Sequence, residues 1–381
     1  MFANESERTM KILNVGNPDA FKNFAVCNYF VNKGEEIHYF SPIPPRVKHK
    51  GIIYHYDSTG KRTKFGFARN VIFLRRLIRA LKPDLVHAHN VYGYGWMAAL
   101  CGQSPLIIHA YGGDVLPEQM KGIKTYQFWL SRFAIKKADR LVVTGHHMAR
   151  TVSEKFNVQL EKIETISRGV DLEIFRPLPD DEKKSLRAKY GISPDKFVIL
   201  SPRYLFDSVY NIDIILRAIA EVQEQSKEIL LIQMHNHDVT ENCFRQTTQL
   251  IAELGIKDKV LLLRNVPNAQ MAELYNTSDL CISVPSSDGF PVTVLEASAC
   301  NVPLIVSRLP YTSEWFENGQ NGLVVGSGDV SSLISAIIAL KENPGKRAKF
   351  AENNFRKVSI EADYKCCMQK LATLYEEVLR A

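Results

Sequence analysis

The sequence predicts an α/β protein built from two Rossmann-like, doubly wound parallel-sheet domains that face a cleft. Three observations support this prediction. The chain has 381 residues, which is more than one hydrophobic core usually accommodates. Short apolar segments alternate with amphipathic helical segments along most of its length. A proline-rich, charged stretch near the middle has the composition of a linker. Sheets of this kind bind ligands at the carboxyl ends of their strands.

The composition is that of an ordinary globular protein, with 45% apolar and 23% charged residues. No apolar run approaches the roughly 20 residues that a membrane-spanning helix needs. The first ten residues are polar and lack the order of a signal peptide, so we expect a cytoplasmic protein. The seven cysteines follow neither a disulfide nor a zinc spacing, which agrees with a reducing compartment.

The first half of the chain alternates strands and helices. Apolar residues that recur every three to four positions predict helices at 21–33 and 68–81. Short apolar runs predict strands, at 11–15, 36–40, 84–89, 106–109 and 140–144.

A second series begins near residue 196. Strands are expected at 197–200, 228–234, 259–263, 280–284, 303–306 and 322–325. Helices are expected at 211–223, 269–276, 291–300, 331–341 and 346–380, the last with a break near 358–359. The linker composition places the domains at 1–175 and 176–358. A C-terminal helix at 359–381 is expected to pack back on the first domain.

One segment of the second half predicts an anion site. The loop 285–290 follows a buried strand, and Pro291 suits the first position of a helix. The N–H groups of residues 292–294 would then be free at the positive end of the helix dipole. Gly289 permits close approach of a ligand, and Asp288 and Glu296 could accept hydrogen bonds from sugar hydroxyls. The alternative interpretation is a proline-capped turn with a chance pair of acids.

The stretch from Ser287 to Val306 closely resembles the donor-site signature of the retaining glycosyltransferase family 4 of the GT-B fold. That signature has two acids separated by seven residues, followed by small residues and an apolar strand. Further stretches resemble the same family in the same order, at 84–89, 112–114, 138–144, 169–177 and 318–324.

The resemblance implies a retaining glycosyltransferase (EC 2.4) that moves a hexosyl or N-acetylhexosaminyl group. The donor would be a nucleotide-diphosphate sugar, with a UDP-sugar favoured, and no cofactor or metal would be needed. The acceptor would be a glycan or a lipid-linked or lipopolysaccharide-type molecule. The first domain would bind the acceptor and the second the donor. The resemblance implies front-face displacement, in which catalysis depends on positioning and on stabilising the diphosphate.

Carried over by position, the resemblance implies three groups of site residues. The catalytic group comprises Asp288, Glu296, Arg203 and Tyr111. The donor-binding group comprises Gly289, Phe290, Pro291, Val292, Thr293, Asn265, Val266 and Arg264. The acceptor side comprises Gly16, Asn17, His109, Gly112 and Asp114.

The chain departs from the family pattern at several of these positions. The first acid is usually Glu, and Asp288 is one methylene shorter. The family's second diphosphate-binding cation falls near Ser208, so a positive charge is missing there. Arg264 is a candidate replacement, and the alternative is a solvated rim residue. Tyr111 stands where the family has His, and His109 is more consistent with a core histidine than with a participant. Gly16 is the one glycine left of a glycine-rich loop.

The stretch 46–82 contains eleven Lys or Arg residues and a single acid, Asp57. One interpretation is a solvated surface. The other is a contact with anionic lipid at the inner face of a membrane, in agreement with a peripheral location. No nucleic-acid-binding pattern is present, so nucleic acid is not an expected partner.

Two other functions remain open at this point. A nucleotide-sugar epimerase or a phosphorylase would use the same fold, although no motif indicates the pyridoxal lysine that a phosphorylase needs. A non-catalytic protein that binds a nucleotide sugar or a partner is the other alternative, because Ser208 and Tyr111 depart from the family pattern.

Overall fold

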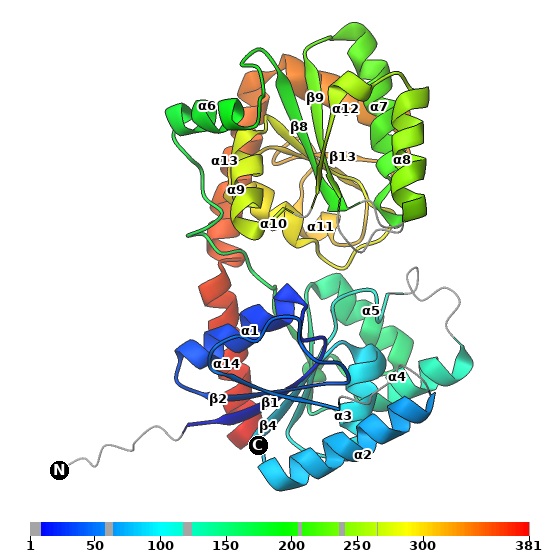
Figure 1. The fold of residues 1–381 in the computed structure, drawn as a ribbon, viewed down its shortest axis with the longest axis vertical. Coiled ribbons are helices and arrows are strands. Elements are labelled where there is room, and N and C mark those ends of the chain that lie inside the picture. Colours follow the sequence, from blue (N-terminus) through cyan, green and yellow to red (C-terminus); the bar gives the residue numbers. More distant parts are fainter. Residues whose placement is uncertain are drawn as a thin grey trace, which may run out of the picture. The chain divides into compact units, whose positions relative to one another are not determined.

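A computed structural model describes residues 9–57, 64–116, 124–204, 208–235, 241–264 and 266–380. Contacts divide the chain into two units (Figure 1), one comprising Met1–Arg168 with Cys367–Ala381 and the other Gly169–Cys366. Each unit contains one parallel sheet covered by helices. The predicted fold class, two doubly wound α/β domains, is confirmed.

The sheet of the first unit has seven parallel strands in the described residues, in the order β3-β2-β1-β4-β5-β6-β7. The strand order reverses between β1 and β4, as in doubly wound folds. The strands are β1 (Lys11–Val15), β2 (Glu36–Ser41), β3 (Ile52–Tyr56), β4 (Leu85–His89), β5 (Leu106–His109), β6 (Arg140–Val143) and β7 (Ile163–Thr165).

Helices cover both faces of this first sheet. On one face, Leu13 and Val15 of β1 share a core with Leu74 of α2 and Ile135 of α4. On the other, Phe30 of α1 stacks on Tyr375 of α14, with ring centroids 4.6 Å apart. The helices are α1 (Phe21–Asn32), α2 (Lys64–Leu81), α3 (Trp96–Cys101), α4 (Thr125–Lys137), α5 (His146–Phe156) and α14 (Tyr364–Arg380), with short turns η1 (Val91–Gly95) and η2 (Leu160–Lys162).

The sheet of the second unit has six parallel strands in the described residues, in the order β10-β9-β8-β11-β12-β13. Its order reverses between β8 and β11, so the ligand-binding edge is expected there. The strands are β8 (Phe197–Tyr204), β9 (Ile229–His235), β10 (Val260–Arg264), β11 (Leu280–Ser283), β12 (Leu304–Ser307) and β13 (Leu323–Val325).

Two apolar clusters cover the faces of this second sheet. One contains residues of α9, α10 and the end of α13, and the other contains residues of α7, α8 and α12. The helices are α6 (Asp180–Lys189), α7 (Ile212–Gln225), α8 (Glu241–Glu253), α9 (Asn268–Thr277), α10 (Val292–Ala299), α11 (Thr312–Trp315), α12 (Val330–Glu342) and α13 (Pro344–Glu361), with turns η3 (Ser208–Tyr210) and η4 (Lys257–Lys259).

The same device sets strand register in both units. An aspartate just before a strand accepts a hydrogen bond from the N–H near the start of a neighbouring strand. Asp84 accepts from Lys11 at 2.8 Å, Asp139 from Leu106 at 2.7 Å and Asp279 from Val198 at 2.8 Å. A one-residue slip would break these bonds and turn every side chain to the wrong face.

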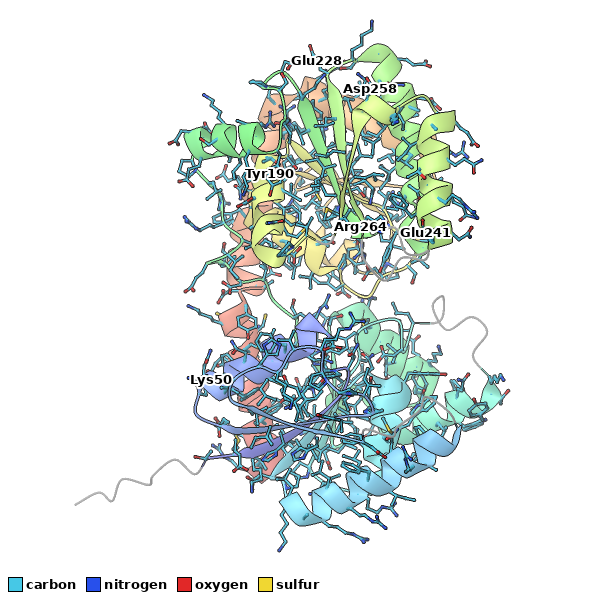
Figure 2. The ribbon with its side chains drawn as sticks, viewed as in Figure 1. Lys50, Tyr190, Glu228, Glu241, Asp258 and Arg264 are labelled. Carbon is cyan, nitrogen blue, oxygen red and sulfur yellow. The ribbon has the colours of Figure 1, made fainter. Side chains whose placement is uncertain are left out.

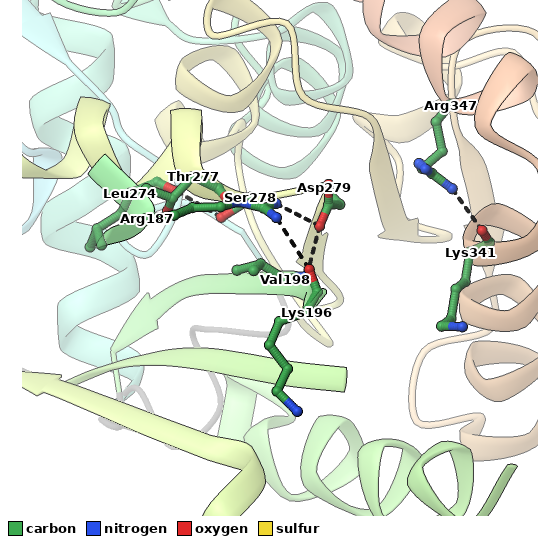
Figure 3. Close-up of polar contacts among 9 residues, drawn as sticks. All are labelled: Arg187, Lys196, Val198, Leu274, Thr277, Ser278, Asp279, Lys341 and Arg347. Atoms are coloured by element: carbon green, nitrogen blue, oxygen red, sulfur yellow. Dashed lines mark hydrogen bonds and ion pairs between the residues drawn. The ribbon is translucent and has the colours of Figure 1, made fainter. Parts of the chain in front are cut away.

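Arg187 of α6 extends this device in the second unit (Figure 3). Its guanidinium donates to Asp279 at 2.8 Å and to the carbonyl oxygens of Thr277 at 3.0 Å and Lys196 at 3.2 Å. The helix that follows the linker is therefore fixed to the amino edge of the sheet, away from the carboxyl ends of the strands. The carboxyl edge of the sheet, on the opposite side, remains available for ligands.

The expected elements differ from the observed ones mainly at their ends. The break in the C-terminal helical region lies at 362–363 rather than near 358–359, because α13 continues to Glu361. Strands β3 and β7 were not expected, since β3 mixes histidine and tyrosine with isoleucine and β7 has three residues. The helices that were not expected are α3, α4, α5, α6, α8 and α11. Among the described residues, no helix is long and apolar enough to cross a membrane.

Candidate functional site

The N-terminus of α10 lies at the carboxyl edge of the second sheet, directly after β11. Pro291 is the residue that caps this helix, so the helix begins at Val292 and not at Pro291 as expected. The N–H of Val294 bonds to the carbonyl oxygen of Pro291 at 3.1 Å, which corrects the expectation that it is free. Within the described residues, the N–H groups of Val292 and Thr293 have no acceptor, and neither has the buried Thr293 hydroxyl.

Arg203 and Asp288 form an ion pair at this edge. Arg203 comes from the end of β8 and Asp288 from the loop before α10, and their side chains are only 11% and 17% exposed. The Arg203 guanidinium also lies 4.6 Å from the centre of the Tyr210 ring. Its Nε atom is buried and has no hydrogen-bond partner among the described residues. A charged donor thus remains unsatisfied beside a helix N-terminus.

Two further residues of the second unit hold these groups in place. The Gln233 side chain donates to the carbonyl oxygen of Arg203 at 2.6 Å, which ties the end of β8 to β9. The N–H of Ser286 donates to the carbonyl oxygen of Val209 at 2.7 Å, so the turn carrying Tyr210 is joined to the loop carrying Asp288.

Glu296 lies one turn into α10, where a tyrosine fixes it. The Tyr275 hydroxyl donates to Glu296 Oε2 at 2.9 Å and lies 3.2 Å from the carbonyl oxygen of Thr293. Tyr275 is fully buried, and burial raises its pKa well above the ordinary value. Its hydroxyl therefore remains protonated and donates at any physiological pH. Because this hydrogen bond holds Oε2, it fixes the orientation of the whole Glu296 carboxylate, including Oε1.

The remaining expected donor residues lie around this edge. Gly289 and Phe290 are both buried, and the Phe290 ring lies 5.2 Å from that of Trp315. Arg264 is exposed at the end of β10, with its guanidinium 5.9 Å from the centre of the Phe244 ring (Figure 2). Val266 is half-buried, whereas Asn265 lies outside the described residues, as does the side chain of Ser208.

At the carboxyl edge of the first sheet, Gly16 and Asn17 follow β1. The Tyr39 hydroxyl donates to the carbonyl oxygen of Asn17 at 3.0 Å. A Cβ atom at Gly16 would lie 2.5 Å from that hydroxyl and 3.1 Å from Cβ of His89. Only glycine fits there, so the loop is packed tightly against its neighbours.

Tyr111 is part of a polar chain at this first edge. Its hydroxyl lies 2.9 Å from Nδ1 of His89, and Nε2 of His89 lies 2.9 Å from Oδ1 of Asn14. The His109 ring stacks on Tyr111 at 4.2 Å, and the Arg168 guanidinium lies 5.9 Å from the centre of the Tyr111 ring. Desolvation raises the pKa of the Tyr111 hydroxyl, which therefore stays protonated.

Asp114 organises the turn that carries Tyr111 and Gly112. Its Oδ1 accepts from the N–H of Tyr111 at 3.0 Å and of Gly112 at 3.1 Å, and its Oδ2 accepts from the N–H of Val91 at 2.7 Å. Gly112 has a φ of 122°, which side-chain-bearing residues rarely adopt. Both carboxylate oxygens of Asp114 are therefore used to hold backbone.

His87 lies beneath this edge and is not a proton carrier. It is fully buried, and burial lowers its pKa to about 3. Its Nδ1 lies 2.5 Å from the Tyr375 hydroxyl, so the neutral imidazole accepts a hydrogen bond from α14. Among the described residues, no three His, Cys, Asp or Glu side chains form a cluster that could hold a metal ion.

The structure thus gathers the expected residues into two groups. Arg203, Asp288 and the start of α10 meet in the second unit, and Gly16, His109 and Tyr111 lie around one polar chain in the first. The sequence interpretation missed Tyr275, Tyr210 and Gln233, which position the group of residues in the second unit. No local signal marks them, since each reads as an ordinary core or turn residue.

Two family models match the chain, "Glycosyltransferase Family 4" over residues 24–174 and "Glycosyl transferases group 1" over residues 182–357. The chain belongs to the group 1 glycosyltransferases, within glycosyltransferase family 4. The resemblance noted in the sequence is confirmed.

Two curated relatives from bacteria are similar to this chain over most of its length. It is 25% identical over 288 residues to D-inositol 3-phosphate glycosyltransferase 2 of Catenulispora acidiphila, covering 71% of this chain and 65% of the relative. The chain therefore spans slightly less than two thirds of that relative's length. It is also 25% identical over 368 residues to N-acetyl-alpha-D-glucosaminyl L-malate synthase of Bacillus anthracis, covering 91% of each.

Solved structures share the fold of this glycosyltransferase. Sucrose-phosphate synthase from Thermosynechococcus elongatus superimposes with a TM-score of 0.85 at 16% identity, covering 98% of this chain and all of that one. Anabaena HepE in complex with UDP-glucose superimposes with a TM-score of 0.82 at 17% identity, covering 97% and 100%. These similarities confirm the GT-B class of the fold.

Proposed function

We propose that this glycosyltransferase transfers a hexosyl or N-acetylhexosaminyl group from a UDP-sugar to an acceptor hydroxyl, with retention of the anomeric configuration. One observation carries the donor assignment. The N–H groups of Val292 and Thr293, the Thr293 hydroxyl and Nε of Arg203 have no partner among the described residues. Unsatisfied donors of this kind at a helix N-terminus suit a diphosphate.

The diphosphate binds by exchange with Asp288. Asp288 pairs with the Arg203 guanidinium in the structure, and an incoming phosphate would compete for the same guanidinium. Once released, the Asp288 carboxylate is available to accept hydrogen bonds from hydroxyls of the donor sugar. Asp288 would therefore pair with Arg203 before the donor binds and accept hydrogen bonds from the donor sugar afterwards.

Glu296 binds the ribose of the donor. A ribose diol needs an acceptor in a fixed orientation, and the Tyr275 hydroxyl at 2.9 Å provides that orientation. We assign the nucleobase to the backbone around Asn265 and Val266. Uracil is favoured because the structurally similar Anabaena HepE was solved with UDP-glucose. Arg264 is the proposed second cation for the diphosphate, since it ends β10 at the same edge.

Transfer proceeds by front-face displacement that requires no metal. The bond between the anomeric carbon and the diphosphate oxygen breaks, and its electron pair goes to that oxygen. The acceptor oxygen attacks from the same face, and its proton passes to the departing diphosphate. Arg203 and the α10 dipole stabilise the developing negative charge, which is the main electrostatic demand of this step.

The acceptor binds to the first unit through Gly16, Asn17, Tyr111, His109 and Gly112, with Asp114 holding the turn. A glycan or a lipid-linked molecule is the proposed acceptor. The second candidate is a small anionic acceptor. Arg168 beside Tyr111 supplies a cation for it, and the relatives are named for D-inositol 3-phosphate and L-malate.

The basic stretch 46–82 is proposed to contact anionic lipid at the inner face of a membrane. Its described part includes α2, where Arg69 pairs with Asp57 at 2.9 Å and Arg75 donates to the carbonyl oxygen of Leu100. Arg76 and Arg79 are exposed on the same helix. Lys61 and Arg62 lie outside the described residues.

A panel of nucleotide sugars tests the donor assignment. UDP-sugars are expected to raise the thermal unfolding midpoint more than GDP- or ADP-sugars, by mass action on the folded state. Slow release of UDP from the stabilising donor, without acceptor, would separate a transferase from an epimerase, which returns an altered UDP-sugar. A protein that no nucleotide sugar stabilises would contradict the proposal. The anomeric configuration of the product, measured by NMR, tests retention.

A further inference from the structure

Helix α4 exposes three aromatic side chains on one face. Tyr126 is 51% exposed, Trp129 is 56% exposed and Phe133 is 41% exposed. Their spacing of three and four residues places them in one row along the helix. The opposite face is buried, and the Trp96 side chain donates to Ser131 Oγ there at 3.1 Å. Because the inner face of α4 is well packed, the three aromatic side chains face outward.

Cations flank this aromatic row. Lys124, Lys136 and Lys137 are exposed, and the Arg132 guanidinium lies 5.4 Å from the centre of the Trp129 ring. No Asp or Glu occurs between residues 124 and 137. The neighbouring turn η2 reaches α4 through Lys162, whose Nζ donates to the carbonyl oxygen of Lys136 at 2.7 Å. That turn adds the exposed Leu160, 49% exposed, and one acid, Glu161.

We propose that α4 docks on an anionic membrane surface, with Tyr126, Trp129 and Phe133 at the boundary of headgroups and acyl chains. Amphipathic tyrosine and tryptophan rings are enriched at that boundary. The lysines reach lipid phosphates, as on other basic helices that lie in the interface. Aromatic residues and arginine are also enriched in protein–protein interfaces, but lysine is depleted there, so the three exposed lysines favour the membrane over a protein partner.

This surface is distinct from the arginines of α2. Helix α3 packs against both α2 and α4, so the two helices belong to one side of the first unit. Ile72, 53% exposed, is the large apolar side chain that α2 exposes in its described part. Long-range attraction can arise from α2, whereas α4 exposes three large aromatic side chains in one row that can insert into the interface. The inference extends the membrane contact proposed for 46–82 and identifies its anchor.

Flotation of the full chain with vesicles tests the docking surface. The chain should float with vesicles of phosphatidylglycerol and phosphatidylcholine and stay behind with phosphatidylcholine alone. Trp129→Ser and Phe133→Ser should each weaken this binding about tenfold or more, since each removes a large apolar side chain from the interface. Lys136→Glu with Lys137→Glu should weaken it most strongly at low salt.

A matched variant on α2 distinguishes a specific contribution of α4 from a general effect of removing exposed apolar side chains. Ile72→Ser removes an apolar side chain of comparable exposure and should leave flotation within about twofold of the unmodified chain. Equal losses from Ile72→Ser and Trp129→Ser would overturn the assignment to α4. Absence of flotation with anionic vesicles would also overturn it, as would self-association of the chain that Trp129→Ser abolishes.

The donor site is monitored in the same samples. Release of UDP from a soluble UDP-sugar should be unchanged in Trp129→Ser, because α4 belongs to the other unit. Loss of flotation with normal UDP release supports the docking surface independently of the donor assignment. Normal flotation in a chain that binds no nucleotide sugar would leave the docking surface intact and contradict the proposed function alone.

Discussion

The carboxyl edges of the two sheets differ in the kind of polar group that they present. The first edge has a chain of hydroxyl, imidazole and amide groups that satisfy one another, from Tyr111 through His89 to Asn14. The second edge has a charged pair, Arg203 with Asp288, beside a helix N-terminus with unsatisfied donors. Two sheets of the same topology therefore offer different partners to a ligand.

The difference agrees with the two binding tasks proposed for this fold. Backbone amides on Asp114 and the close packing at Gly16 make the first edge a preformed polar surface, suited to hydroxyl recognition. At the second edge the positive charge of Arg203 is paired with Asp288, and the proposal is that a stronger anion displaces this carboxylate. If the first edge binds its ligand through shape and the second through charge exchange, as proposed, substitutions should separate the two.

The largest effect is expected from Arg203→Ala. It removes the cation proposed to stabilise the departing diphosphate, so kcat/KM for transfer should fall about 100-fold or more. Steady-state kinetics with a UDP-sugar measures this. Arg217→Ala is the control, because Arg217 is exposed on α7. A loss of less than about threefold in Arg203→Ala would remove Arg203 from the diphosphate site.

Stability at acid pH probes the core beneath the first edge. The pKa of His87 is about 3 in the folded chain and about 6.5 when unfolded, so below pH 6.5 the unfolded chain binds a proton that the folded one does not. The free energy of unfolding should therefore decrease by about 2 kcal/mol between pH 7 and pH 5 from this group alone.

Denaturant titrations of the unmodified chain and of His87→Asn measure that decrease. Asn keeps an acceptor for the Tyr375 hydroxyl and does not titrate, so its unfolding free energy should vary less with pH. Identical pH dependence in both proteins would mean that His87 is not buried in its neutral form.

A smaller effect is expected from Tyr275→Phe. The hydroxyl that orients Glu296 is lost while the packing of the ring remains, which should cost about 1 kcal/mol. KM for the donor should increase roughly fivefold with little change in KM for the acceptor. An unchanged donor KM would show that Glu296 is oriented by other contacts.

The smallest effect is expected from Tyr111→Phe at the first edge. His89 loses one hydrogen-bond partner, and the stacking on His109 remains. KM for the acceptor should increase about threefold, while binding of UDP should not change. A similar weakening of UDP binding in this variant would mean that the first edge does not serve the acceptor alone.

Site residues that lie close together in the sequence could be predicted from it. Contacts between residues that are far apart in the sequence could not. Loop, cap and acids from Asp288 to Glu296 lie within nine positions, so the sequence alone indicated an anion site there. The Arg203–Asp288 pair joins residues 85 positions apart, and only the strand order brings them together. The free donor expected at Val294 was wrong because Pro291 caps the helix instead of beginning it.

The aromatic row of α4 was not predicted for a different reason. Apolar and cationic residues at 125–137 do not form a clean periodic pattern, since both faces of the helix carry aromatic side chains. Only the exposed fractions separate Trp129 and Phe133 from the buried residues between them. Such a surface becomes visible once the packing of the other face is known.

Calorimetric titration of UDP into the unmodified chain, Arg203→Ala and Asp288→Asn tests charge exchange at the second edge most directly. Asp288→Asn should bind UDP about fivefold to tenfold more tightly, because the diphosphate no longer competes for Arg203. Arg203→Ala should bind it at least about tenfold more weakly. Asp213→Asn, exposed on α7, should match the unmodified chain. Weaker UDP binding in Asp288→Asn would contradict the exchange and with it the division of roles between the two edges.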